Sequence, residues 1–217
     1  MSDIFREVDE EVRREQFAKL WQRHGGLLIA ACVLLVVAVG GWRGYQWWEA
    51  KKAAVSGTAF QAAIALADQG KHKEAEEAFA KLASDSTASY RMLARLREAA
   101  ELAHRDPKGA VAIYDKLAVD SSIGAVLQDV ASLRAGMILV DTAPYDEIRQ
   151  RLEPQTASDR AFRHSARATL ALSAWRAKDS AAMKRWSDMI LADAETPAGT
   201  RGQVQMLLAL SEADKKS

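Results

Sequence analysis

Hydrophobic residues are distributed very unevenly along this chain. From Gly25 to Trp42 there are 18 consecutive residues without a charge. As a helix, this segment would span roughly 27 Å at about 1.5 Å per residue, close to the hydrocarbon thickness of a bilayer, about 30 Å. Aromatic residues flank it on both sides, and their rings favour the lipid headgroup region. The pattern predicts a transmembrane helix, which we place at residues 25–45.

Two other interpretations of the apolar segment are weaker. A buried core helix rarely lacks charged residues for so long. A cleaved signal peptide begins with a short basic region, whereas six acidic residues precede this segment. Ile29–Cys32 is similar to a lipoprotein cleavage box, but the apolar segment continues far past Cys32. The side chains expected at the two membrane interfaces are Trp21, Trp42, Arg43, Tyr45, Trp47 and Trp48.

Lys and Arg counts predict the orientation of the span. Five of them precede it, and three follow it up to Lys52, which favours a cytoplasmic N-terminus. In a Gram-negative bacterium the chain would then be a single-pass inner-membrane protein with a periplasmic C-terminal domain. Residues 1–24 would form a cytoplasmic tail, either an amphipathic interfacial helix or a frayed charged segment.

The chain after the span has helical periodicity throughout, with apolar residues three and four positions apart. Its prolines fall where helices are expected to stop, and no stretch alternates with a period of two. We expect a helical linker over 46–56, continuous with the first helix of the following domain, with Ser56–Gly57 as the place for a bend. An all-α domain is predicted over 57–217.

Two segments of this domain repeat each other. Residues 75–86 align with residues 110–121 at an offset of 35, with small Ala75 and Ala110 at one position and aromatic Phe79 and Tyr114 at another. A helix–turn–helix unit of about 34 residues with such positions resembles the tetratricopeptide repeat. The alanines would let paired helices approach closely, and the rings would fill the space toward the next repeat.

The remaining units are less regular. We expect first helices near 57–69, 88–104, 124–140 and 159–177, each followed by a second helix, with Gly70 at the first tight turn. A capping helix is expected over 201–213. The predicted fold is therefore all-α, with a single N-terminal transmembrane helix followed by a TPR-like α-solenoid of about four helix pairs. An unrelated antiparallel helical bundle is the alternative.

Composition excludes several classes of function. The 30 basic and 29 acidic residues give a net charge of +1, too little excess for a nucleic-acid binder that works by bulk charge. One cysteine allows neither an intramolecular disulfide nor a cysteine-based zinc site. Phosphate-binding and hydrolase motifs are absent, and the four histidines are dispersed along the sequence. We therefore predict no catalytic residue, cofactor or metal, and we interpret His164 and Ser165 as ordinary helix residues.

The segments on either side of the span resemble a known bacterial family. Residues 20–26, Leu-Trp-Gln-Arg-His-Gly-Gly, and residues 45–48, Tyr-Gln-Trp-Trp, are similar to the membrane segment of the YfgM-like family. Residues 75–86 are similar to it as well. This family is the ancillary subunit of the SecYEG translocon. The resemblance implies a periplasmic repeat domain, no catalytic residue, and two partners: Sec translocon subunits and a membrane-anchored periplasmic chaperone of the prolyl-isomerase type.

A domain of this kind would bind a peptide or a partner helix in the groove along its first helices. The candidates for that surface, for each of which core packing is an equally open interpretation, are Phe60, Ile64, Met92, Arg95, Leu102, Leu133, Met137 and Arg167. The sequence favours a non-enzymatic adaptor for protein export, tethered to the lipid bilayer. The alternatives are a TPR scaffold for envelope assembly or cell division, and an enzyme with an unrecognised site.

Overall fold

The computed structural model describes the backbone of residues 3–214, and the burial of Trp21, residues 24–27 and residues 29–213. Within residues 3–214 the chain forms helices and no strand, which confirms the predicted all-α class. The α-helices are α1 (Asp3–Asp68), α2 (His72–Asp85), α3 (Ala88–Leu102), α4 (Pro107–Ala118), α5 (Ala125–Leu139), α6 (Tyr145–Leu152), α7 (Arg163–Arg176), α8 (Ser180–Ala192) and α9 (Ala198–Asp214). Two short 3₁₀ helices, η1 (Ser121–Ile123) and η2 (Glu153–Thr156), lie in connections.

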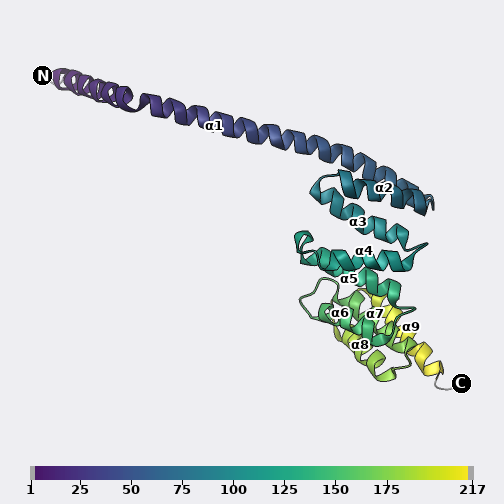
Figure 1. Cartoon of the computed structure of the whole chain (residues 1–217). Helices are drawn as coiled ribbons and strands as arrows, with labels where there is room; N and C mark the ends of the chain where they lie inside the picture. The colour runs from purple at the N-terminus through teal and green to yellow at the C-terminus, as the bar shows by residue number, and fades with distance from the viewer. Residues whose placement is uncertain (1–2, 215–217) are drawn as a thin grey trace. The chain divides into compact units, whose positions relative to one another are not determined.

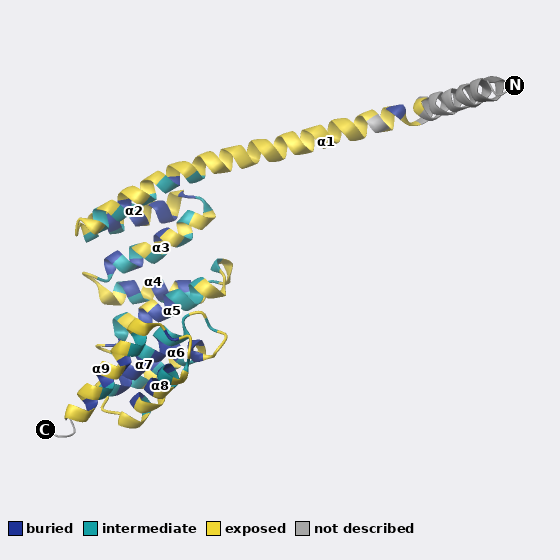
Figure 2. Cartoon of the chain, turned by 180° about the vertical axis from the view of Figure 1, so that it is seen from behind, coloured by how far each residue is buried: buried dark blue, intermediate teal, exposed yellow. Residues whose placement is uncertain are grey.

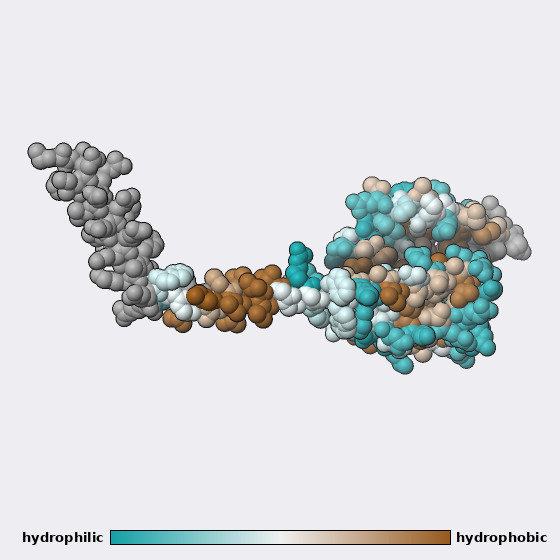
Figure 3. Space-filling model, turned by 90° about the horizontal axis from the view of Figure 1, so that it is seen from above, coloured by the Kyte–Doolittle hydropathy of each residue, from teal (hydrophilic) through white to brown (hydrophobic). Residues whose placement is uncertain are grey.

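Helix α1 carries the apolar segment, and its part from His24 to Asp68 is long and apolar enough to cross a membrane. Among residues 24–50 whose burial is described, all but Gly25 are exposed (Figure 2). Leu34 and Val36, for example, expose 70% and 68% of their surface. Figure 3 shows these hydrophobic side chains as a continuous brown band on the face in view. A core helix of a soluble protein would bury them, so their exposure favours lipid as the surrounding medium.

The chain divides into two compact units, Met1–Ala54 and Val55–Ser217. Helix α1 contributes to both and stays helical through Ser56 and Gly57, where the sequence offered a bend. Gly57 has a packing role instead, because a Cβ atom there would lie 2.7 Å from the Tyr90 hydroxyl. The apolar face suggested for the N-terminal tail involves side chains before Trp21, which lie outside the described residues.

The second unit consists of helix pairs, as predicted. The last turns of α1 share a buried cluster with α2. The pairs α3 with α4, α5 with α6 and α7 with α8 follow. Figure 1 shows α2, α3, α4 and α5 stacked in chain order, with the colour passing from teal to green. Helix α9 packs on α7 and α8 and closes the array, in the place expected for the capping helix.

Helix boundaries follow from local signals in the sequence. Gly70 adopts a φ of 74°, a left-handed conformation that lets the chain turn from α1 into α2. Asp106 and Asp179 cap α4 and α8, each accepting a hydrogen bond of 2.9 Å from the backbone N–H three residues on. Pro107 is the first residue of α4, where its missing N–H costs nothing. Capping and proline placement therefore set the helix lengths.

The repeated alanine and aromatic positions form the core of the second unit. Ala75 and Ala110 are fully buried, while Phe79 is fully buried and Tyr114 is 2% exposed. Phe79 belongs to the same buried cluster as Ala94 of α3, and Tyr114 to the same buried cluster as Ala131 of α5. Each ring therefore lies in a cluster that includes residues of the next pair's first helix, in keeping with the predicted position between repeats.

The last pairs share the largest buried cluster. At its centre is Trp186 of α8, which is fully buried, and its indole N–H donates a 2.8 Å hydrogen bond to the Tyr145 hydroxyl of α6. The Arg185 guanidinium lies 4.5 Å from the centre of the Trp186 ring system. This cluster fixes α6, α7 and α8 against each other and supports the wall of the pocket described next.

Candidate protein-binding site

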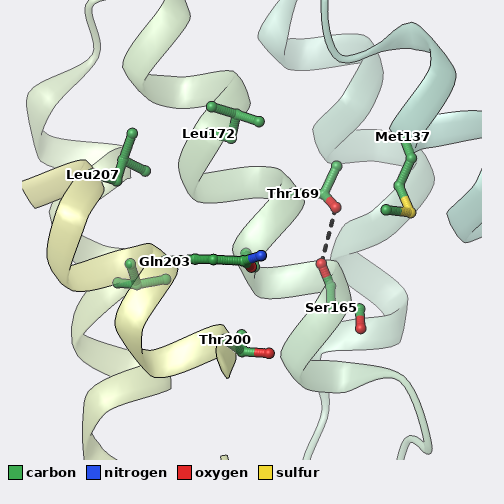
Figure 4. A pocket seen from close by; sticks show the side chains of 9 residues that line it. Met137, Ser165, Thr169, Leu172, Thr200, Gln203 and Leu207 are labelled. Carbon is green, nitrogen blue, oxygen red and sulfur yellow. Dashed lines mark hydrogen bonds between the residues drawn. The ribbon is translucent and has the colours of Figure 1, made fainter. Parts of the chain in front are cut away.

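An open pocket of about 390 Å³ lies between α5, α7 and α9 (Figure 4). Two first helices, α5 and α7, and the capping helix α9 contribute its walls. Its lining residues are Met137, Ser165, Ala168, Thr169, Leu172, Thr200, Gln203, Val204 and Leu207. The pocket therefore lies on the side of the array where first helices were expected to form a binding surface.

The chemistry of the pocket is mainly apolar. Val204 and Leu207 are 2% and 9% exposed, whereas Met137 and Leu172 are 47% and 36% exposed and available to a partner. The Thr169 hydroxyl is already engaged, because it donates a 2.9 Å hydrogen bond to the Ser165 carbonyl. Pockets of this kind accept an apolar side chain and orient it with a few polar groups.

Two stripes of residues explain how the sequence builds the pocket. On α7 the lining residues are 165, 168, 169 and 172, and on α9 they are 200, 203, 204 and 207. Both sets have the spacing i, i+3, i+4, i+7, which places four side chains on one face of a helix. Small residues on the α7 stripe keep the space between the two helices open.

The structure separates the eight predicted binding residues into two groups. Leu102 and Leu133 are buried, and Phe60 and Ile64 pack against the buried cluster around Phe79. Met92 is half-buried and Arg95 is exposed, while Met137 lines the pocket. Binding by Met92, Arg95 and Met137 stays a prediction, whereas the first four residues contribute to packing.

Arg167 also has a packing role. Its side chain is 7% exposed, and its guanidinium donates to the Thr156 carbonyl at 2.7 and 3.0 Å and to Asp193 Oδ2 at 3.0 Å. Arg163 Nε donates to the same oxygen at 3.0 Å. Arg167 therefore joins η2, α7 and the turn after α8. Spacing along one helix could not reveal this, because the acceptors lie 11 and 26 residues away.

Asp193 is the anionic centre of this network. The hydrogen bond from Arg163 is the largest cause that lowers the pKa of Asp193, to about 2. Nearby His164 shares a 3.0 Å hydrogen bond with the Thr196 hydroxyl, and burial followed by the Arg163 charge lowers the pKa of His164. His164 lies on α7 and is hydrogen-bonded to the turn that leads to α9, in keeping with its interpretation as a structural helix residue.

Sequence reasoning missed a cluster elsewhere. His72 and His104, dispersed in the sequence, come together with Glu101 at the ends of α2 and α3. His72 begins α2, Glu101 lies in α3 and His104 lies in the turn after α3, so a search for ligand spacing along one helix face could not find them. By contrast, the residues assigned to the membrane interfaces, Trp21, Trp42, Arg43, Tyr45, Trp47 and Trp48, are all exposed on α1, and their interfacial role stays a prediction.

Stacked helix pairs with a capping helix and a pocket along the first helices define an α-solenoid of the helical-repeat class. Comparison with protein families agrees: residues 18–196 match the tetratricopeptide repeat-like domain, and the chain belongs to this family. The match includes the apolar segment and ends before α9. Comparison with curated proteins and with solved structures finds no match. Domains of this kind generally serve as non-catalytic scaffolds for protein–protein interaction.

Proposed function

We propose that this protein is a single-pass, membrane-anchored adaptor that binds protein partners through the pocket between α5, α7 and α9. The observation that carries the proposal is an exposed apolar helix in the same chain as a repeat domain with an open apolar pocket. Neither feature alone defines an adaptor, but together they supply a tether and a docking surface.

The pocket suits an apolar anchor residue from an extended segment or a helix of the partner. Met137 and Leu172 present apolar surface at its wall, and the adjacent Thr200 and Gln203 offer hydrogen-bonding groups. Few, well-buried anchor residues usually carry most of the binding free energy of such a contact. A methionine in the wall adapts to anchors of different shape, because its side chain is flexible and polarisable.

The tether would raise the local concentration of the docking surface. A domain held near a membrane-bound partner by a short linker experiences an effective concentration on the order of mM. Weak binding in the pocket would then suffice for stable association at the membrane. We therefore expect the partner at or in the same membrane.

We further propose that the partners are subunits of the Sec translocon and a membrane-anchored periplasmic chaperone of the prolyl-isomerase type. The support is the resemblance of residues 20–26, 45–48 and 75–86 to the YfgM-like family. The adaptor would assist exported proteins on the periplasmic side of the inner membrane. Lys and Arg counts on the two sides of the span support that orientation.

Site-specific photocrosslinking in native membranes tests the proposal. A photoreactive amino acid replaces Leu172 in the full-length chain, and in a second variant it replaces Met137. We expect both positions to crosslink Sec channel subunits or the anchored prolyl isomerase after illumination. Lys184 is the control position, since its side chain is 69% exposed on α8 and lies outside the pocket.

Three outcomes would count against the proposal. If Leu172 crosslinked no more strongly than Lys184, the result would contradict a docking role for the pocket. If only cell-division or outer-membrane assembly proteins were crosslinked, the result would contradict the Sec partners and support the alternative scaffold function. Crosslinking to no membrane-associated protein would contradict the tether argument.

A further inference from the structure

The ends of α2 and α3 bring two histidines and a glutamate together, away from the pocket. His72 is the first residue of α2, Glu101 lies in the last turn of α3, and His104 follows in the turn after α3. One ligand atom from each lies within 4.8 Å of the other two. His72 Nδ1 is 2.7 Å from Glu101 Oε2, and the two imidazole rings stack with their centroids 3.7 Å apart.

A neighbouring pair of side chains joins the segments that carry these residues. Arg105 Nε and Nη2 donate to the two carboxylate oxygens of Glu76 at 2.8 and 2.7 Å, a bidentate pair that joins α2 to the turn after α3. The His72–Glu101 contact makes a second connection, between the start of α2 and the last turn of α3. The segments that carry the histidines are therefore fixed before any ligand binds.

The local charges favour a cation. The Glu101 side chain is 8% exposed, and a buried carboxylate needs a positive or hydrogen-bonding partner. The C-terminal end of α3 adds the negative end of its helix dipole at this place. The N-terminal end of α2 opposes a cation, and Glu74 in its first turn offsets part of that effect.

We infer that His72, Glu101 and His104 form a binding site for a divalent transition-metal ion of the Zn²⁺ type. Two imidazoles and one carboxylate suit Zn²⁺, and water would complete a tetrahedral site. Ca²⁺ and Mg²⁺ prefer sites made only of oxygen ligands. The ion would take the place of the hydrogen bond between His72 and Glu101, and a proton held by His72 Nδ1 would be exchanged through solvent to Nε2, so that the metal-bound imidazole stays neutral.

Binding requires the imidazole rings to rotate but changes the distances between the ligand atoms little. Ligand bonds of about 2.0–2.1 Å in a tetrahedron place ligand atoms roughly 3.3 Å apart, not far from the present spacing. The stacked rings must turn, because the lone pair of an imidazole nitrogen lies in the ring plane. His104 is exposed and lies in a turn, so its side chain has room to rotate. The ion would join the first helix pair to the second and stabilise the folded state.

Calorimetric titration of the full-length protein in detergent with ZnCl₂, after removal of metals with a chelator and without a histidine tag, tests the inference. We expect one saturable site per chain, and a rise in the thermal unfolding midpoint that EDTA reverses. His104→Ala should weaken binding at least tenfold, as loss of a ligand costs no less than loss of an outer-shell partner. His24→Ala, which removes an exposed histidine outside the cluster, should bind as the parent protein does.

Circular dichroism shows whether each variant is folded, and Glu101→Gln provides a second test. This variant keeps the shape of the side chain and a hydrogen-bond acceptor for His72 but removes the charge, and it should also weaken binding tenfold or more. The inference is wrong if the parent protein shows no saturable Zn²⁺ binding. It is equally wrong if His104→Ala leaves the affinity unchanged, or if His24→Ala lowers it as much.

Discussion

Asp193 shows how much of the last repeat depends on one side chain. It accepts hydrogen bonds from Arg163 and Arg167 of α7, and its carbonyl oxygen accepts a 3.1 Å hydrogen bond from Arg201 of α9. The residue thus connects the turn after α8 to the two helices that line the pocket. Its charge should therefore matter for the stability of the pocket as well as for the turn.

We predict that Asp193→Asn lowers the unfolding midpoint at neutral pH and that the difference from the parent protein shrinks in acid. The pKa of Asp193 is about 2 in the folded protein and about 3.9 in an unfolded chain. Ionised Asp193 therefore stabilises the fold above about pH 4, and this stabilisation is lost as the pH falls from about 4 to about 2. Denaturant unfolding of both proteins at several pH values, followed by circular dichroism, measures the difference.

Asp188→Asn is the matched control for this prediction. Asp188 pairs with Lys184 one turn earlier on α8, and both side chains are exposed, so the substitution should change stability by no more than about 1 kcal/mol. A gap between Asp193→Asn and the parent protein that stays constant down to about pH 2 would contradict the assigned role of the charge.

Single residues of the repeat were predictable where their role is local. Ala75 and Phe79 lie in one helix at fixed spacing, so the sequence alone indicated a close helix contact and a ring between repeats. Arg167 was not predictable in this way, because its partners come from η2 and from the turn after α8. The same holds for His72 and His104, which meet only because the start of α2 packs beside the end of α3.

At the scale of elements, helix order and helix boundaries follow from the sequence more directly than the pocket does. Gly70, Asp106 and the prolines mark the ends of helices through local backbone chemistry. The pocket depends on which faces of α5, α7 and α9 meet, and this is decided by tertiary packing. Met137 was found from its repeat position, whereas the α9 residues were expected only to cap the array.

Substitutions at two glycines inside helices distinguish the effect of packing on stability from the effect of helix propensity. A Cβ atom at Gly136 of α5 would lie 2.8 Å from Leu152 Cδ1, whereas one at Gly202 of α9 would meet nothing within 4 Å. Leu152 is fully buried and cannot move away freely. We predict that Gly136→Ala lowers the free energy of unfolding by about 1–3 kcal/mol. Gly202→Ala should raise it by about 0.5–1 kcal/mol, because alanine favours the helix.

Denaturant unfolding of the full-length protein in detergent measures both variants under one condition. The difference between the two variants cancels the gain in helix propensity that both share. What remains is the free-energy cost of placing a methyl group at Gly136 against Leu152 of α6. If Gly136→Ala were as stabilising as Gly202→Ala, the close packing of α5 on α6 would not exist as described.

At the scale of the whole molecule, the chain combines an exposed apolar helix with a tetratricopeptide repeat-like domain. The near-balance of basic and acidic residues suits docking by shape and apolar contact more than by bulk charge. The family match supports the interaction role in general, whereas the side of the membrane on which the domain lies is a proposal. That side decides which partners the pocket can meet.

Protease accessibility of a C-terminal tag tests this proposal most directly. The full-length chain with the tag is expressed in a Gram-negative host, and spheroplasts and lysed cells are treated with protease, with a cytoplasmic protein as the control for intact membranes. We expect the protein to sediment with the membrane fraction and the tag to be digested already in spheroplasts. A tag that is protected in spheroplasts and digested only after lysis would contradict this proposal, as would a protein found in the soluble fraction.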